Sequence, residues 1–265
     1  MNLIYKEKTV LNDFLTENKC EIKENKLIPI LIKYYYINGI TDKLELRELI
    51  LQKFYEFDKL NTRDVWTNKV KKSIEEFFKY LRKGNPLLEI VEVESVNIYK
   101  EELDVISKVD QPKFRKFLFT LLVWSKVYKQ FNRNTIVENV RDLLILSKCE
   151  CGNADYRNLM LHKLKETELI WTEISKKGSC KISVNFEKDK GEIAFVVKDF
   201  ENAIYQYLIY IGENWKQCEC GKYFKYSKSK PKQKYCVNCG KRIEKIKTKE
   251  RVKKLRSCQN VTVTP

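Results

Sequence analysis

Two close cysteine pairs near the end of the chain, Cys218/Cys220 and Cys236/Cys239, carry the clearest chemistry in the sequence. Four thiolates can complete the tetrahedral shell of a zinc ion, and a closed site of this kind is structural and supplies folding free energy. The second pair has the usual two-residue spacing of a zinc knuckle, whereas the first pair has a single intervening residue. We therefore predict one structural Zn²⁺ ion with Cys218, Cys220, Cys236 and Cys239 as ligands. Four unliganded thiols are the alternative.

The segment that contains these cysteines is strongly basic. From Lys216 to Pro265 the chain has sixteen Lys or Arg residues and three acidic residues, which gives +13 of the total net charge of +16. The rest of the chain is close to neutral, so the positive field belongs to one small module. Such a module indicates a polyanionic partner. We expect nucleic acid, with duplex DNA favoured and RNA as the alternative.

The run from Lys241 to Arg256 has a narrow apolar stripe and would be a marginal helix alone. Bound along a phosphate backbone it would lose its self-repulsion, whereas the alternative is a solubilising or disordered tail. Tyr223 and Tyr226 lie among lysines and are candidates for base stacking, while Phe224 and Tyr235 are expected to fill the small core of the finger. The predicted nucleic-acid contacts of this module are Lys222, Tyr223, Lys225, Tyr226, Lys228, Lys241, Arg242, Lys245, Lys249, Arg251, Lys253, Lys254 and Arg256.

Two further units must precede and position this module. Apolar spacing in the first predicts helices at 27–37, 44–57 and 66–81, an alternating strand at 91–94 and a short helix at 101–107. In the second we expect three helices at 114–130, 135–147 and 155–167, a hairpin of strands at 181–186 and 192–197, and a last helix from Asp199 to Tyr210. Three helices followed by a hairpin is the winged-helix arrangement.

The predicted fold class is mainly α (α+β). It has two winged-helix-like units, followed by a small treble-clef-like zinc finger and a basic C-terminal helix. Asp110-Gln111-Pro112 is the predicted junction, which gives an N-terminal helical, winged-helix-like domain at 1–110, a winged-helix domain at 111–215 and the finger with its basic tail at 216–265.

Apolar runs and cysteine usage bear on the compartment. The longest apolar runs are far shorter than a bilayer span, so no membrane partner is expected. Nine scattered cysteines, an odd number, do not form a secreted disulfide framework. We expect a cytoplasmic protein in which most cysteines are thiols.

In a winged helix the third helix can enter the major groove of DNA while the hairpin reaches the neighbouring backbone. The predicted contacts are Arg157, Asn158, His162 and Lys165 on that helix, and Lys176, Lys177, Lys188 and Lys190 on the wing. The alternative is a protein–protein scaffold whose exposed lysines are an ordinary solvated surface. In the first unit this scaffold interpretation is favoured, because glutamates on its third helix offset the lysines.

The sequence does not indicate catalysis. His162 is the only histidine, which removes most zinc-hydrolase and Ser-His arrangements. The chain also lacks a Walker-type phosphate loop and a dinucleotide glycine fingerprint. We predict that the protein is not an enzyme, and a nuclease site assembled from distant acidic residues is the remaining alternative.

Three stretches, Val96–Ile106, Phe117–Lys126 and Tyr207–Asn214, together with the terminal cysteine pairs, resemble a group of uncharacterised phage and prophage proteins of low-GC Gram-positive bacteria. The resemblance covers most of the chain. Those proteins end in a four-cysteine finger, often with a two-residue first spacing, from which Cys218/Cys220 departs. The resemblance implies a mobile-element context and brings no established activity.

These features predict a nucleic-acid-binding protein that acts in transcription or replication control of a phage or mobile element. The alternative is a phage-encoded interaction or anti-defence protein that binds RNA or a host nucleic-acid-processing complex. Binding through the basic tail should be largely independent of sequence, so any sequence preference must come from the third helix of the second unit.

Overall fold

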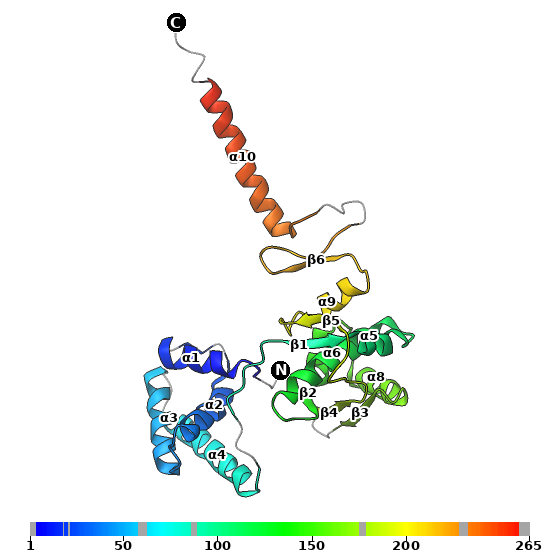
Figure 1. Ribbon diagram of the computed structural model, residues 1–265. Helices are drawn as coiled ribbons and strands as arrows, with labels where there is room; N and C mark the ends of the chain where they lie inside the picture. Colours follow the sequence, from blue (N-terminus) through cyan, green and yellow to red (C-terminus); the bar gives the residue numbers. More distant parts are fainter. Residues whose placement is uncertain are drawn as a thin grey trace. The chain divides into compact units, whose positions relative to one another are not determined.

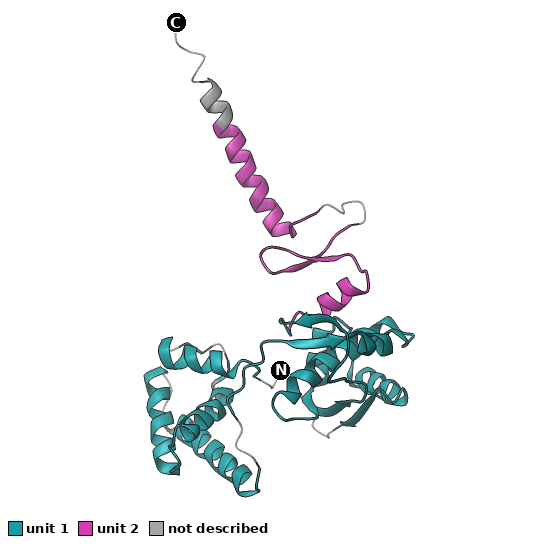
Figure 2. Ribbon diagram, viewed as in Figure 1, with its two compact units in different colours: residues 1–200 teal, residues 201–265 magenta. Residues whose placement is uncertain are grey.

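The computed structural model describes residues 4–17, 19–20, 22–57, 63–85, 89–174, 179–227 and 233–259. The chain divides into two compact units, unit 1 at Met1–Phe200 and unit 2 at Glu201–Pro265 (Figure 2). It is 56% helical and 13% strand, which confirms a mainly helical fold of mixed class. Among the described residues, no helix combines the length and the apolar character that crossing a membrane requires.

The first part of unit 1 consists of α1 (Glu7–Glu17), α2 (Glu24–Ile37), α3 (Lys43–Phe57) and α4 (Arg63–Arg82) (Figure 1). The helices predicted at 27–37, 44–57 and 66–81 are confirmed as α2, α3 and α4, whereas α1 was not predicted. Because α2 is apolar on most sides, it packs against all three of the other helices. The Phe54 and Trp66 rings stack in this core with their centroids 4.7 Å apart.

The segment after α4 returns to the start of the chain. Glu92 forms a single antiparallel bridge with Lys6. Beside it, the buried carboxylate of Glu7 pairs with the buried ammonium of Lys33 on α2. The N–H of Glu7 donates to the Val91 carbonyl at 3.0 Å and the N–H of Val93 donates to the Tyr5 carbonyl at 2.9 Å. The strand predicted at 91–94 is therefore wrong, because the described pairing here is a single bridge.

The rest of unit 1 contains β1 (Val96–Tyr99), α5 (Lys100–Ser107), α6 (Pro112–Lys129), β2 (Ile136–Asn139), α7 (Val140–Leu146), α8 (Ala154–Glu166), β3 (Ile170–Ile174), β4 (Ser179–Val184) and β5 (Ile193–Val197). α6 is the central helix, and every residue from Phe117 to Tyr128 is buried. Strands β2, β4 and β3, in that order, form an antiparallel sheet, and β1 pairs separately with β5. The β1–β5 pair joins the predicted domain 1–110 to the predicted domain 111–215 within one unit.

Two predictions for this part of the chain need correction. The segments 181–186 and 192–197 do not form a hairpin, because β4 pairs with β2 and β3 while β5 pairs with β1. The helix predicted at 135–147 begins with strand β2, and α7 starts only at residue 140. The Asn139 side chain marks this change by accepting a hydrogen bond of 2.8 Å from the Arg141 N–H.

Unit 2 contains α9 (Ala203–Tyr210), β6 (Trp215–Gln217), β7 (Tyr223–Lys225) and α10 (Val237–Gln259) (Figure 1). Strands β6 and β7 form an antiparallel hairpin. The Tyr205 ring of α9 stacks on Tyr223 with centroids 4.8 Å apart and also contacts the Trp215 ring at 4.7 Å. Aromatic rings therefore join α9 to the hairpin that carries the first cysteine pair.

Candidate metal centre and nucleic-acid interface

The four cysteines predicted as ligands converge in unit 2. Their sulfur atoms all lie within 4.8 Å of one another, and the Sγ atoms of Cys220 and Cys236 are 3.8 Å apart. All four are free thiols. A tetrahedral site with Zn–S bonds of about 2.3 Å has sulfur–sulfur distances of about 3.8 Å. The donor set and its spacing therefore fit a metal ion held by four sulfur ligands.

A tight turn between β6 and β7 provides the first two ligands. The N–H of Cys218 donates to the Lys222 carbonyl at 2.9 Å, and the N–H of Gly221 donates to the Cys218 carbonyl at 2.8 Å. Gly221 has φ +81°, a conformation that favours glycine. The turn accommodates the single-residue spacing of Cys218 and Cys220, because glycine supplies the left-handed residue that closes it.

The second pair lies where α10 begins. Cys236 immediately precedes the helix, Cys239 lies in its first turn, and the N–H of Gly240 donates to the Cys236 carbonyl at 2.8 Å. Helix N-termini favour thiolates because the N–H groups and the helix dipole stabilise negative charge. The same cysteines that could hold a metal ion therefore also mark the start of the basic helix.

Hydrogen bonds shift the pKa values of two of these thiols in opposite directions. The backbone N–H groups of Cys220 and Cys236 donate to the Cys218 sulfur, which lowers the pKa of the Cys218 thiol to about 6. The pKa of Cys239 is raised, because its thiol hydrogen bonds with the sulfurs of Cys220 and Cys236.

The predicted phosphate contacts of unit 2 are exposed wherever they are described. This group comprises Lys222, Lys225, Lys241, Arg242, Lys245, Lys249, Arg251 and Lys253. Lys228 and the side chains of Lys254 and Arg256 lie outside the described residues. The structure thus places a dense set of cations on the surface of one long helix and one hairpin.

The two tyrosines predicted to stack on bases have partners inside the protein. The Tyr223 ring stacks on Tyr205 with an interplanar angle of 13°. The Lys216 ammonium lies over the Tyr226 ring, 4.4 Å from its centroid. Both rings are partly buried, so stacking on a base would require them to leave these contacts.

On α8, three of the predicted reading residues, Asn158, His162 and Lys165, are exposed. Arg157 differs, because its guanidinium donates to the Gly152 carbonyl at 2.8 Å and so supports the turn that precedes the helix. His162 Nδ1 lies 3.3 Å from the carboxylate of Glu166. Arg157, which was predicted to read bases, thus makes a local contact within the protein.

The outward face of α8 carries two carboxylates, a histidine and an apolar residue. Asp155, Leu159, His162 and Glu166 share the side opposite the buried Leu164, as the helical repeat requires. Leu159 is 54% exposed. This face lacks the net positive charge that attracts phosphates.

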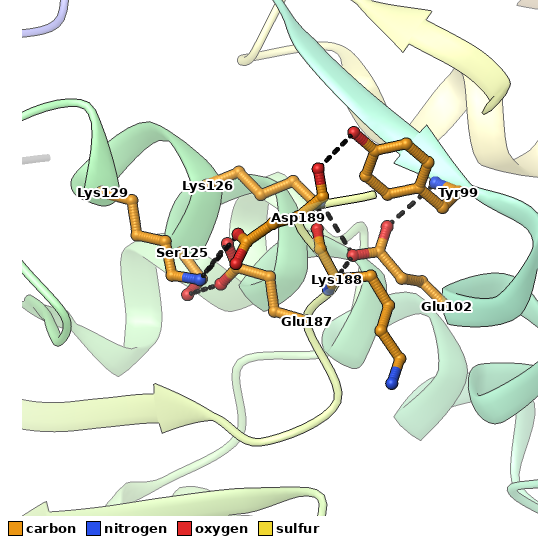
Figure 3. A network of polar contacts seen from close by, with 8 residues as sticks. All are labelled: Tyr99, Glu102, Ser125, Lys126, Lys129, Glu187, Lys188 and Asp189. Carbon is orange, nitrogen blue, oxygen red and sulfur yellow. Dashed lines mark hydrogen bonds and ion pairs between the residues drawn. The ribbon is translucent and has the colours of Figure 1, made fainter. Parts of the chain in front are cut away.

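The segment from Glu187 to Lys190, predicted as a wing, is held against α5 and α6 (Figure 3). The fully buried carboxylate of Glu102 accepts from the Lys188 N–H at 2.7 Å and pairs with the Lys126 ammonium at 2.8 Å. Lys126 also donates to the Lys188 carbonyl at 2.8 Å. The wing assignment of Lys188 and Lys190 is therefore corrected, because a buried network fixes the backbone of this segment. The side chain of Lys188 points away from these contacts (Figure 3).

A second carboxylate completes this network. Glu187 accepts from the Ser125 hydroxyl at 2.6 Å and pairs with Lys129 at 2.9 Å. Sequence analysis missed these roles, although Glu102 in the first turn of a short helix is the position from which a glutamate can bond to the N-cap backbone. The hairpin next to α8 is instead β3–β4, whose connecting residues, Lys176 and Lys177 included, lie outside the described residues.

An open pocket of about 300 Å³ lies beside this network, with Tyr99, Lys126, Lys129, Glu187 and Asp189 in its wall. Its cations and anions bond to one another: Lys129 contacts both Glu187 and Asp189, and the Tyr99 hydroxyl donates to the Asp189 carbonyl at 3.0 Å. These groups hold the segment in place.

Comparison with protein-family models, with curated proteins and with solved structures finds no match for this chain. The geometry and charge of the residues described above are therefore the basis on which its function is inferred. Two surfaces differ most in this respect: the basic helix that follows the cysteines, on which positive charge dominates, and the outward face of α8, which carries two carboxylates.

Proposed function

We propose that the chain is a non-enzymatic DNA-binding protein that holds duplex DNA through α10, and that one structural Zn²⁺ ion orders unit 2. The observation that carries the proposal is the surface of α10. Between Lys241 and Lys253 the helix has seven basic and two acidic residues, and all seven basic side chains are exposed. So many like charges repel one another in isolation and are stabilised by a polyanion.

The choice of Zn²⁺ rests on the ligands. Four cysteine thiolates in a tetrahedral arrangement are a typical structural zinc shell, which leaves no open coordination position for catalysis. One pair lies in a hairpin turn and the other at the start of a helix, as in treble-clef fingers. The small core around the cysteines, with Cys218, Phe224 and Cys236 buried, offers little apolar area, so a bound ion would supply much of the folding free energy of this part of unit 2.

The proposal includes a winged-helix body within unit 1. The order α6, β2, α7, α8, β3, β4 and the sheet order β2-β4-β3 match the arrangement of that fold. In it, α8 is the groove-reading candidate, and its charge balance supports only a secondary contribution to phosphate binding. A role in transcription or replication control of a phage or mobile element rests on the sequence resemblance alone.

The test is the salt dependence of duplex binding by the full chain, with and without metal. The logarithm of the binding constant should fall linearly with the logarithm of salt concentration, by about 0.9 per neutralised phosphate. Removal of metal should abolish most of the affinity. A metal-loaded chain that fails to bind duplex DNA at low salt would refute the proposal.

A second candidate, a protein-interaction role for unit 1, is favoured by one observation. Leu159 on α8 is 54% exposed and Trp171 on β3 is 44% exposed. Replacing Asn158 and Lys165 by alanine tests it: unchanged affinity and unchanged sequence preference for duplex DNA would favour the interaction role. Loss of sequence preference would instead show that α8 reads DNA.

A further inference from the structure

The basic residues of α10 are not distributed evenly around the helix. Each residue advances about 100° around the axis, so positions four apart share one side. By this spacing one side carries a set that we call the basic face: Lys241, Arg242, Lys245, Lys249 and Lys253. The opposite side carries a set that we call the mixed face: Ile243, Glu244, Lys247, Glu250 and Arg251.

The two faces differ in net charge although they belong to one helix. The basic face has five cations and no anion, whereas the mixed face has two cations and two anions. An α-helix with its side chains is about 10 Å thick, and the Debye length is about 8 Å at physiological salt. A bound partner therefore senses mainly the face that it touches and not the summed charge of the helix.

The basic face is also long, and it winds gradually around the helix because positions four apart differ by about 40°. Its ends, Lys241 and Lys253, are twelve residues apart, which corresponds to about 18 Å at 1.5 Å per residue. Successive cations at four-residue spacing are about 6 Å apart along the axis. A rigid row of this kind suits the regular phosphates of a duplex, because neither partner must be ordered for several contacts to form at once.

We propose that the basic face lies along one phosphate strand of duplex DNA while the mixed face points to solvent. This inference rests on the function proposed above and adds the orientation of the helix to it. A helix inserted into the major groove meets phosphates on both flanks, where Glu244 and Glu250 would repel them. Side chains that contact only phosphates carry no sequence information, so binding through the basic face should be independent of base sequence.

Duplex is favoured over single strands for a separate reason. Single-strand binding without sequence preference relies on aromatic rings that stack on unpaired bases. The rings predicted to stack are Tyr223, which stacks on Tyr205, and Tyr226, which lies beneath the Lys216 ammonium. Neither ring is presented to an unpaired base.

Two matched double variants of the full, metal-loaded chain test the orientation. Lys245→Ala with Lys249→Ala removes two charges from the basic face, and Lys247→Ala with Arg251→Ala removes two from the mixed face. Because alanine favours helix, both should keep α10 folded, which circular dichroism and metal content would verify. The basic-face pair should lower duplex affinity at least tenfold and reduce the salt slope by about 2. The mixed-face pair should lower affinity less than threefold and leave the slope unchanged.

The possible outcomes distinguish the proposed orientation of α10 from the proposed function. Equal losses from both pairs, with wild-type binding intact, would overturn the orientation and leave the proposed function standing. Failure of the wild-type chain to bind duplex DNA would overturn both. Tighter binding to single-stranded DNA or to an RNA duplex of the same length, or a strong preference among DNA sequences that survives the removal of α8 contacts, would also overturn the orientation.

Discussion

Units 1 and 2 differ in where their charged side chains lie and in whether those side chains are paired. In unit 1 several charged groups are buried and paired, as Glu102 is with Lys126 and Glu7 with Lys33. In unit 2 the described cations of α10 are exposed, and the cluster of buried residues at the cysteine site consists of two cysteines and Phe224. Unit 1 uses these charges to fix its own segments, whereas the described cations of α10 are exposed to solvent.

The sources of order differ in the same way. Unit 1 has an extensive apolar core, in which α6 is buried from Phe117 to Tyr128. Around its four thiols, which lie within 4.8 Å of one another, unit 2 has only a small buried cluster of Cys218, Phe224 and Cys236 among the described residues. We therefore expect unit 1 to fold by apolar burial alone and unit 2 to depend on a bound ion for its folding.

The largest effect should come from breaking the cysteine cluster. Cys236→Ser removes a ligand at the start of α10, and a structural zinc shell of this kind is worth about 10–16 kcal/mol of apparent binding free energy. We expect α10 to lose protection in amide hydrogen exchange while α6 keeps it.

Cys151→Ser is the matched control, since Cys151 lies outside the cluster in unit 1. It should leave exchange in both units unchanged. Full protection of α10 in the Cys236→Ser chain would contradict the expectation that unit 2, unlike unit 1, depends on a bound ion for its folding.

A smaller effect, confined to unit 1, should follow from Glu102→Gln. This change leaves the Lys126 ammonium buried without its counter-charge and should lower the free energy of unfolding of unit 1 by about 3–5 kcal/mol. Chemical denaturation would measure it. Glu150→Gln, at an exposed position, is the control. Addition of Lys126→Met to the Glu102→Gln chain should recover part of the loss, because it removes the unpaired charge; no recovery would contradict this account of the network.

The smallest effect is a pH dependence in unit 1. Burial raises the pKa of the Cys180 thiol from its ordinary value of 9.0 to about 12. A raised pKa in the folded state contributes stability below the ordinary value, and this contribution is lost as pH rises through the interval between the two values. Between pH 8 and pH 10 the wild-type chain should therefore lose about 1 kcal/mol more stability than Cys180→Ala. A stability difference that stays constant over this pH range would argue against a buried, neutral thiol.

The sequence predicted the elements that local patterns determine. α6 and α8 have helical apolar spacing and appear close to their predicted bounds. The four cysteines were identifiable because each pair is close in sequence and needs only a short turn or a helix start to bring its sulfurs together. The signal for α1 was present as Val10, Leu11 and Phe14 on one side of a short helix.

Long-range pairing could not be read in the same way. Strand β5 pairs with β1 from the first half of the chain, whereas the lysines and glycine before β5 resemble a turn back to β4. The determining contacts are those of Glu102 and Glu187, which hold the intervening segment against α5 and α6. Likewise the sequence of β2 and α7 matches one continuous helix. Ile136, Val140 and Leu143 have helical spacing, and they are also buried in the strand and short helix that form instead.

The most direct test is a titration of Zn²⁺ into the metal-free full chain, with helicity and duplex affinity measured on the same samples. Both quantities should rise together and saturate when one ion is bound per chain. A chain that shows full helicity and full duplex affinity before any metal is added would contradict the account.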